Sequence, residues 1–396
     1  MKKKCAALFL VLAFAFSMCT MAYADTTSAA LGLSSDSLAL KKGESTVLTV
    51  NDGSSVTWTS SNPAVAPVSD GNVTGAALGR ATVTATAADG RIAACAVNVA
   101  LKGIDVSSYQ GTVDWMAVKA SGVDYAILRD GYGNEHPETQ TDTTFAANYD
   151  GAVANGIKVG AYHVSYAKTA AEALQEAQFC LSILNGRKLD YPLYLDVEQP
   201  FHSTMQENEL DTVISTFCNA MIRAGYRTGV YANATLLNQF KNIPAFHTYD
   251  IWVAHHNVSV PNYSGEFNLW QYSAAGTVPG ITGAVDMNYA YQEYPLGAQT
   301  QPGAIPTLVD PAMASDTGAA ISLQAGKTYQ FRFTPKNPSD KPVFSTGNNQ
   351  VIKTVFQKKI GTSYYYKIQG VGKGCTSVYS TLAKQKPVRR CIVTVA

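Results

Sequence analysis

The stretch "YPLYLDVEQP", residues 191–200, places two acids, Asp196 and Glu198, in an otherwise apolar run. Residues two apart on a strand point to the same side, so the two carboxylates share one face while Leu195 and Val197 take the other. A buried carboxylate is costly unless it is paired or hydrogen-bonded. Taken alone, the pair favours a structural salt bridge to Arg or Lys. Whether the two acids have a functional role depends on the other residues of the chain.

Around this stretch, residues 101–296 alternate strand-like and helical runs. The apolar spacing predicts helices over 115–121 and 144–155, and longer ones in "TAAEALQEAQFCLSILNG" (169–186) and "ENELDTVISTFCNAMIRAGY" (207–226). Repeated strand–helix units indicate a parallel sheet. About eight strands predict a closed barrel that loses its helices in its final third.

Two segments of different texture flank the barrel. Residues 33–100 are short alternating strands separated by turns, the pattern of an Ig-like β-sandwich. After a Pro/Gly/Gln linker at 297–306, residues 307–396 alternate again and predict a small all-β domain. The fold class is therefore multidomain, a modified (β/α) TIM-like barrel flanked by an N-terminal sandwich and a C-terminal β-rich module.

The first residues predict secretion. Three lysines precede an apolar run and an A-x-A site, the layout of a signal peptide over residues 1–24. The remaining cysteines are too few for a disulfide scaffold and contain no metal motif, although Cys375 and Cys391 lie in neighbouring strand-like segments and could bridge. A formal net charge of +1 gives no footprint for nucleic acid and no basic patch for a membrane.

Polar side chains recur where the predicted barrel strands end, and such ends meet at one mouth. Crowded carboxylates there push their pKa values apart, so one stays protonated while another stays ionised. Glycoside hydrolysis needs that combination, and aromatic side chains suit sugar rings. A hard-cation site would show denser acidic loops. The strand-end acids are Asp105, Asp196, Glu198 and Asp286.

Seven ordered blocks carry a family resemblance. "GIDVSSYQGTVDW", "DYAILRDGYG", "VGAYHVSYA", "YPLYLDVE", "GVYAN", "NLWQYS" and "AVDMNYAY" occur in the order found in glycoside hydrolase family 25, the Chalaropsis-type lysozymes. Residues 33–100 resemble a group 2 bacterial Ig-like domain, through "LKKGES" and "VTWTSSNPAVAPVSDGNVTGAALGRATVTATA".

The resemblance implies a retaining muramidase that cleaves the β-1,4 bond between N-acetylmuramic acid and N-acetylglucosamine in peptidoglycan. Glu198 matches the general acid/base, and Asp196 matches the nucleophile or the group that orients the N-acetyl. Asp105 and Asp286 match the two acids that tune the site. No metal or other cofactor is implied. The expected substrate contacts are Tyr162, Tyr231, Trp270, Gln271 and Arg129.

Some features depart from the family pattern or leave alternatives open. Arg129 of "LRDGYG" stands where many relatives have Lys, and His255 and His256 are expected to be rim or structural residues. The rival functions are a wall-binding protein without catalysis and a hydrolase of a related N-acetylated glycan such as chitin. The expected partners are peptidoglycan glycan strands, with other wall polymers as candidates for the flanking modules, and the expected state is a monomer outside the cell or at its wall.

Overall fold

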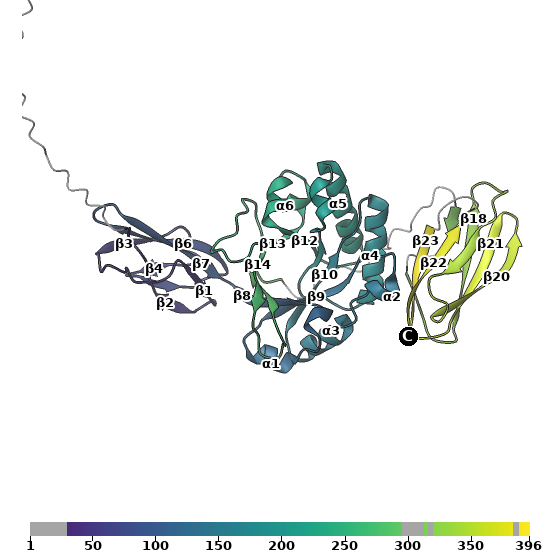
Figure 1. Cartoon of the computed structure of the whole chain (residues 1–396), viewed down its shortest axis with the longest axis horizontal. Coiled ribbons are helices and arrows are strands. Elements are labelled where there is room, and N and C mark those ends of the chain that lie inside the picture. The colour runs from purple at the N-terminus through teal and green to yellow at the C-terminus, as the bar shows by residue number, and fades with distance from the viewer. Residues whose placement is uncertain (1–29, 295–312, 316–319, 383–387) are drawn as a thin grey trace, which may run out of the picture.

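The computed structural model describes residues 30–294, 313–315, 320–382 and 388–396. The predicted signal peptide and the linker lie outside these residues. In Figure 1 the described chain forms an N-terminal β-module, a central barrel and a C-terminal β-module in a row. Within the described residues, no helix has the length and apolar character needed to span a bilayer.

The N-terminal module has two sheets. One has the order β1-β7-β6-β3, with β1 parallel to β7, and the other has the order β2-β5-β4. Their inward side chains, among them Leu48, Val73 and Val97, form one core. The strands are β1 (Ser37–Leu40), β2 (Ser45–Val47), β3 (Val56–Ser60), β4 (Val68–Ser69), β5 (Asn72–Thr74), β6 (Gly79–Ala87) and β7 (Ile92–Val99).

The central segment is a closed eight-stranded barrel in the order β10-β11-β12-β13-β14-β15-β8-β9. Its strands are β8 (Leu101–Val106), β9 (Tyr125–Tyr132), β10 (Lys158–Val164), β11 (Leu193–Asp196), β12 (Thr228–Asn233), β13 (Asp250–Ala254), β14 (Leu269–Gly276) and β15 (Val285–Ala290). Its helices are η1 (Ser108–Gln110), α1 (Trp115–Ala120), α2 (Pro137–Gln140), α3 (Phe145–Ala154), α4 (Ala170–Leu184), η2 (Pro200–Thr204), α5 (Glu207–Arg223), α6 (Ala234–Gln239) and α7 (Ala245–Thr248).

The prediction of a parallel sheet holds for β8 to β14, but β15 runs antiparallel to both of its neighbours. Parallel neighbours need a crossover of a dozen or more residues. The chain between β14 and β15, residues 277–284, is too short for one and turns through Gly280 and Gly283, both with positive φ. The last strand therefore returns as a hairpin arm and closes the barrel against β8.

Alternation along the strands gives the barrel two cores. Inward residues, including Tyr125, Tyr194 and Trp252, fill the interior, and outward ones pack under the helices. The interior aromatic rings require small neighbours, because a Cβ on Gly103 would lie 2.2 Å from the Tyr125 ring and one on Gly229 would lie 2.3 Å from the Tyr194 ring. Aromatic side chains thus fill the interior of the barrel, and polar side chains lie at the end where the parallel strands finish.

The C-terminal residues form two four-stranded sheets, β16-β18-β21-β20 and β17-β23-β22-β19. Phe331, Phe333, Tyr366 and Ile368 lie in the core of this module. The strands are β16 (Met313–Ser315), β17 (Ala320–Leu323), β18 (Thr328–Pro335), β19 (Val343–Thr346), β20 (Ile352–Ile360), β21 (Ser363–Gly370), β22 (Gly374–Thr381) and β23 (Val388–Val395). β17 and β23 lie against α4, so the sheet containing β20 and β21 faces away from the barrel (Figure 1).

The predicted Cys375–Cys391 bridge stays a prediction. The strand register pairs Cys375 with Thr394 and Cys391 with Val378, so the two cysteines are not cross-strand partners. The side chain of Cys375 lies outside the described residues.

Candidate active site

Four carboxylates lie at the mouth of the barrel. Asp105 of β8 and Asp286 of β15 are direct cross-strand partners, and Asp196 ends β11. Glu198 follows two residues later, just beyond the end of β11, and lies near enough to Asp196 for its charge to raise the pKa of that carboxyl. Strands far apart in the sequence therefore bring the predicted acids to one end of the barrel.

Asp105 is held by two side-chain amides. Its Oδ2 accepts hydrogen bonds from Gln271 Nε2 at 3.0 Å and from Asn288 Nδ2 at 2.7 Å. Each amide is itself fixed, because Asn288 Oδ1 accepts from Trp252 Nε1 and Gln271 Oε1 accepts from Tyr231 Oη, at 2.8 and 2.9 Å. Sequence reasoning missed Asn288, although it stands two residues after Asp286 and so faces the same side of the strand.

Asp105 and Asp286 affect each other's pKa. Burial, together with the charge of Asp286, raises the pKa of the Asp105 carboxyl well above its ordinary value. Burial also raises the pKa of Asp286, and the hydrogen bond with Asp105 partly offsets this rise. Of the two carboxyls, Asp105 therefore has the more strongly raised pKa, and Asp286 is the one that ionises more readily.

Asp196 is 3% exposed, and its Oδ1 has no hydrogen-bond partner within the described part of the chain. Burial raises the pKa of this carboxyl well above its ordinary value, and Glu198 and Asp105 raise it further. A buried acceptor without a partner is unfavourable in a folded protein. Asp196 ends β11, two residues before Glu198, which lines both hollows of the mouth.

Glu198 is exposed at the mouth. Partial burial by the surrounding walls, together with the charge of Asp286, raises the pKa of its carboxyl, and His256 acts in the opposite direction. A raised pKa suits a carboxyl that must be protonated to act as a general acid near neutral pH.

Two hollows meet at Glu198. The first has a volume of about 540 Å³ and is lined by Tyr109, Arg129, Tyr132, Tyr166 and Gln199, among others. The second, of about 410 Å³, is lined by Tyr231, Asn233, Asn238, His255 and His256, among others. Glu198 lines both, so a chain molecule lying across the mouth would pass directly over this carboxyl.

Arg129 lies in the wall of the first hollow. Its Nε donates to Asp142 Oδ2 at 2.8 Å, and a terminal guanidinium nitrogen donates to Ser108 Oγ at 3.0 Å. The Tyr109 ring lies 5.0 Å from the guanidinium carbon. Neither Asp142 nor Ser108 was singled out from the sequence.

The structure differs from the prediction for Trp270. Its side chain is 2% exposed, belongs to the outer core and donates to the main-chain oxygen of His255 at 2.8 Å. Since adjacent strand residues point to opposite sides, Trp270 and Gln271 could not both face the mouth. The tryptophan that lies inside the barrel is Trp252 of β13. Its ring packs edge-on against the rings of Tyr162 and Tyr231.

Gln271 also differs from a simple substrate contact. Its Nε2 donates to Asp105, and its Oε1 accepts from both Tyr231 and His256. The amide oxygen therefore has two donors and the amide nitrogen holds Asp105, so Gln271 positions this carboxyl. His256 is part of this network through a 2.9 Å bond, which places it inside the site rather than only at the rim.

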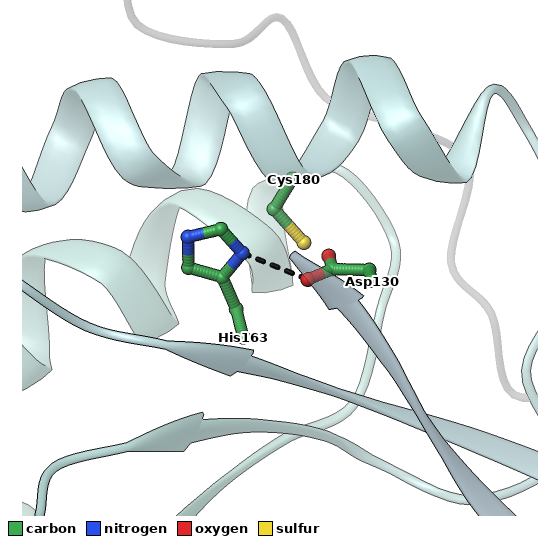
Figure 2. Close-up of side chains that lie close together, drawn as sticks. All are labelled: Asp130, His163 and Cys180. Carbon is green, nitrogen blue, oxygen red and sulfur yellow. Dashed lines mark hydrogen bonds and ion pairs between the residues drawn. The ribbon is translucent and has the colours of Figure 1, made fainter. Parts of the chain in front are cut away.

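A second polar cluster lies on the outer side of the same strands, beneath α4. Figure 2 shows His163 and Asp130 joined by a 2.7 Å bond, with the Cys180 sulfur pointing toward the carboxylate. The His163, Asp130 and Cys180 ligand atoms lie within 4.8 Å of one another, close enough to hold a metal ion. However, His163 Nε2 also faces an acceptor, the main-chain oxygen of Gly133 at 3.0 Å.

With protons on both ring nitrogens, His163 donates to both acceptors and forms an ion pair with the Asp130 carboxylate, the state that its raised pKa favours. Burial alone would lower the pKa of His163, but the charge and hydrogen bond of Asp130 outweigh it and the pKa is raised. The cluster therefore has the contacts of a buried ion pair rather than of a metal centre.

Comparison with known proteins identifies the family of the barrel and of the N-terminal module. The model of glycosyl hydrolases family 25 matches residues 104–281, and that of the group 2 bacterial Ig-like domain matches residues 29–97. An autolytic lysozyme of Clostridium acetobutylicum is 32% identical over 193 residues, which are 48% of this chain and 55% of the relative. Lysozyme M1 of Streptomyces globisporus is 31% identical over 204 residues, 48% of this chain and 67% of the relative.

The protein is a multidomain member of a glycoside hydrolase class. The chain belongs to glycosyl hydrolases family 25. It spans little more than half the length of the Clostridium relative. Among solved structures, the bacterial lysozyme from Streptomyces coelicolor is 28% identical, with a TM-score of 0.42 over 49% of this chain and 93% of that chain.

Proposed function

We propose that this protein is a secreted peptidoglycan hydrolase, an N-acetylmuramidase that cleaves the β-1,4 bond between N-acetylmuramic acid and N-acetylglucosamine with retention. The observation that carries the proposal is the place of Glu198. Its carboxyl has a raised pKa, lies beside the buried Asp196 and lines both hollows of the mouth. A glycan that fills both hollows would present a glycosidic oxygen to this group.

In the first step, Glu198 donates its proton to the leaving oxygen as the glycosidic bond breaks. The same carboxylate then takes a proton from the water that completes hydrolysis. The charge of Asp286 supports the protonated state of Glu198 before the first step, because it raises the pKa of that carboxyl.

Asp196 acts on the sugar that develops positive charge. Its partnerless Oδ1 supports contact with the substrate. Two routes use this contact. In one, the carboxylate attacks the anomeric carbon. In the other, it accepts the N–H of the N-acetyl group, whose oxygen then attacks. Both routes lead to net retention.

The remaining groups position and bind. Gln271 and Asn288 hold Asp105, and the Asp105–Asp286 pair keeps one anion near Glu198. Tyr231, which is 9% exposed, and Tyr162 are the aromatic surfaces nearest the acids, and Arg129 offers donors in the first hollow. Trp270 is left out of the proposed substrate contacts.

Location and architecture complete the proposal. Peptidoglycan lies outside the membrane, which agrees with the signal-peptide pattern of residues 1–24. We infer that the barrel is a modified (β/α) barrel whose last strand is reversed, and that the flanking β-modules attach it to the wall as a monomer.

The test uses purified peptidoglycan. The full chain should release reducing ends that, after borohydride reduction and acid hydrolysis, yield muramitol and not glucosaminitol. Glu198→Gln should lower this release by at least about 1000-fold, whereas Glu207→Gln, an exposed acid on α5, should leave it unchanged. Full activity of Glu198→Gln overturns the assignment of the acid. Faster release from chitin oligomers than from peptidoglycan overturns the substrate.

A further inference from the structure

The net charge of +1 conceals a strong separation of charge along the chain. Residues 313–396 contain 13 Lys and Arg but only two acids, Asp316 and Asp340. Residues 1–312 contain 17 Lys and Arg and 27 Asp and Glu. A charge asymmetry of this size between domains indicates an electrostatic role for one of them.

The strand register gathers part of this charge on one sheet face. In the sheet β16-β18-β21-β20, Phe331, Tyr366 and Ile368 point into the core, so the alternate residues point outward. Arg332, Tyr365 and Lys358 are neighbours across three strands, and Lys367 and Lys353 lie on the next rows of the same face. We call Arg332, Lys353, Lys358, Tyr365 and Lys367 the cationic face.

The cationic face is open to solvent. Its four basic side chains are exposed, and β18, β20 and β21 contain no acidic residue. The Lys358 ammonium lies 5.6 Å from the centre of the Tyr365 ring, a cation–π distance. In Figure 1 this sheet is the one turned away from the barrel.

Protection of an exposed sheet edge is the simplest alternative reason for the lysines, because charged residues prevent edge-to-edge association. It accounts for Lys353 and Lys358, which stand on the edge strand β20. It does not account for Lys367 on β21 or Arg332 on β18, which are interior strands of the sheet. A face that is basic across three strands fits a binding role better than edge protection.

We propose that the cationic face binds an anionic, phosphodiester-linked polymer of the cell wall, of the teichoic-acid class. Charge complementarity selects an anionic partner, and rows of cations across three strands fit a flexible polymer with repeated charges better than one small anion. Tyr365, between Arg332 and Lys358, offers an apolar surface to a sugar or polyol unit. The interaction retains the enzyme at the wall while the barrel acts on the glycan.

The test is cosedimentation of the full chain with purified walls. One arm uses walls that carry phosphodiester polymers, and a second uses the same walls after these polymers have been removed with hydrofluoric acid. The binding variant is Lys353→Glu/Lys358→Glu/Lys367→Glu. The matched control carries the same change of charge on exposed lysines elsewhere, Lys42→Glu/Lys188→Glu/Lys241→Glu.

The native chain and the control should bind intact walls at least about tenfold more tightly than stripped walls, with a difference that shrinks as salt rises. The binding variant should lose this difference. Equal binding of the native chain to both walls overturns the proposal, as does an equal loss in the control. Binding to anionic lipid vesicles without preference for intact walls also overturns it. Release of reducing ends is followed in parallel, so a failure of the proposed hydrolysis is seen separately from a failure of wall binding.

Discussion

Asp105 and Asp286 face each other across the antiparallel seam of the barrel, where β15 returns beside β8. Only this reversed strand places Asp286 opposite Asp105, with Asn288 beside the pair. The pKa of Asp105 is raised more strongly than that of Asp286, and the charge of Asp286, after burial, raises the pKa of Glu198.

The first prediction concerns the pH profile of Asp286→Asn. The proposed reaction needs protonated Glu198, so activity falls as pH rises through the pKa of this carboxyl. Burial still raises that pKa in the variant, but the contribution of Asp286 is gone. The alkaline limb of kcat/KM should therefore begin at lower pH, with roughly tenfold or more loss near neutrality. Asn at this position keeps the shape of the side chain.

The control for this shift is Glu207→Gln, which removes one negative charge from α5 and should leave the alkaline limb where it is. A limb that stays in place in Asp286→Asn would show that Asp286 does not act on Glu198. A limb that moves to higher pH would contradict the sign of the coupling.

The second prediction compares the amide of Asn288 with His256. Asn288→Leu leaves the buried Asp105 with one amide donor fewer and should lower kcat by about 10- to 100-fold. His256→Ala removes one donor to Gln271 but leaves the 2.9 Å bond from Tyr231, so its loss should be about threefold or less. Initial rates on solubilised peptidoglycan measure both. Equal losses of kcat in the two variants would contradict the expectation that Asn288 matters more than His256.

Sequence reasoning located the acids because strand alternation and strand order are local properties. It predicted which residues of β11 face inward, and it expected about eight strands. The direction of β15 was missed because it depends on the length of the preceding turn, and Asn288 was missed because an amide alone has no titration signal. Trp270 was assigned to the mouth on resemblance, although its neighbour Gln271 already occupied that face.

Charge was readable only in part. The total of +1 was used to set aside nucleic acid and a membrane surface, and the excess of Lys and Arg after residue 313 appears in the sequence once each domain is counted separately. Only the strand register, however, shows that Lys367 and Arg332 share a face with Lys358.

The third prediction follows from the buried position of Trp270. Trp270→Phe removes the hydrogen bond to His255 and part of the outer core, so the free energy of unfolding should fall by about 1–3 kcal/mol. KM for peptidoglycan should change by less than about twofold, because the indole does not reach the mouth. Urea unfolding and steady-state rates give the two numbers. A large rise in KM at unchanged stability would show that Trp270 contacts the substrate, as expected from the family resemblance.

The last prediction concerns the ion pair of His163 and Asp130. A register shift between β9 and β10 lies at this point, with Tyr162 opposite Arg129 and His163 opposite Gly131. Bulges of this kind re-aim neighbouring side chains. Asp130 and His163 point under α4, while their chain neighbours Arg129 and Tyr162 point to the mouth, so the pair fixes both from behind.

Removing one partner leaves the other charge buried and unpaired, so Asp130→Ala should lower the free energy of unfolding by about 3–5 kcal/mol. The double variant Asp130→Ala/His163→Phe should recover part of this loss, because the ring at 163 lies between Phe179 and Phe217. Urea unfolding of the native chain and the two variants measures the difference. A double variant less stable than Asp130→Ala would show that His163 has a role beyond the ion pair.

The pair also has a pH signature. The folded pKa of His163 is raised above its ordinary value of 6.5, so the stability from the pair is full below about that pH and is lost as pH rises through the folded pKa. Unfolding free energies measured from below pH 6.5 upward should therefore fall more steeply for the native chain than for Asp130→Ala/His163→Phe. Identical slopes would mean that His163 is not an imidazolium in the folded protein, and the pair would then be a neutral hydrogen bond.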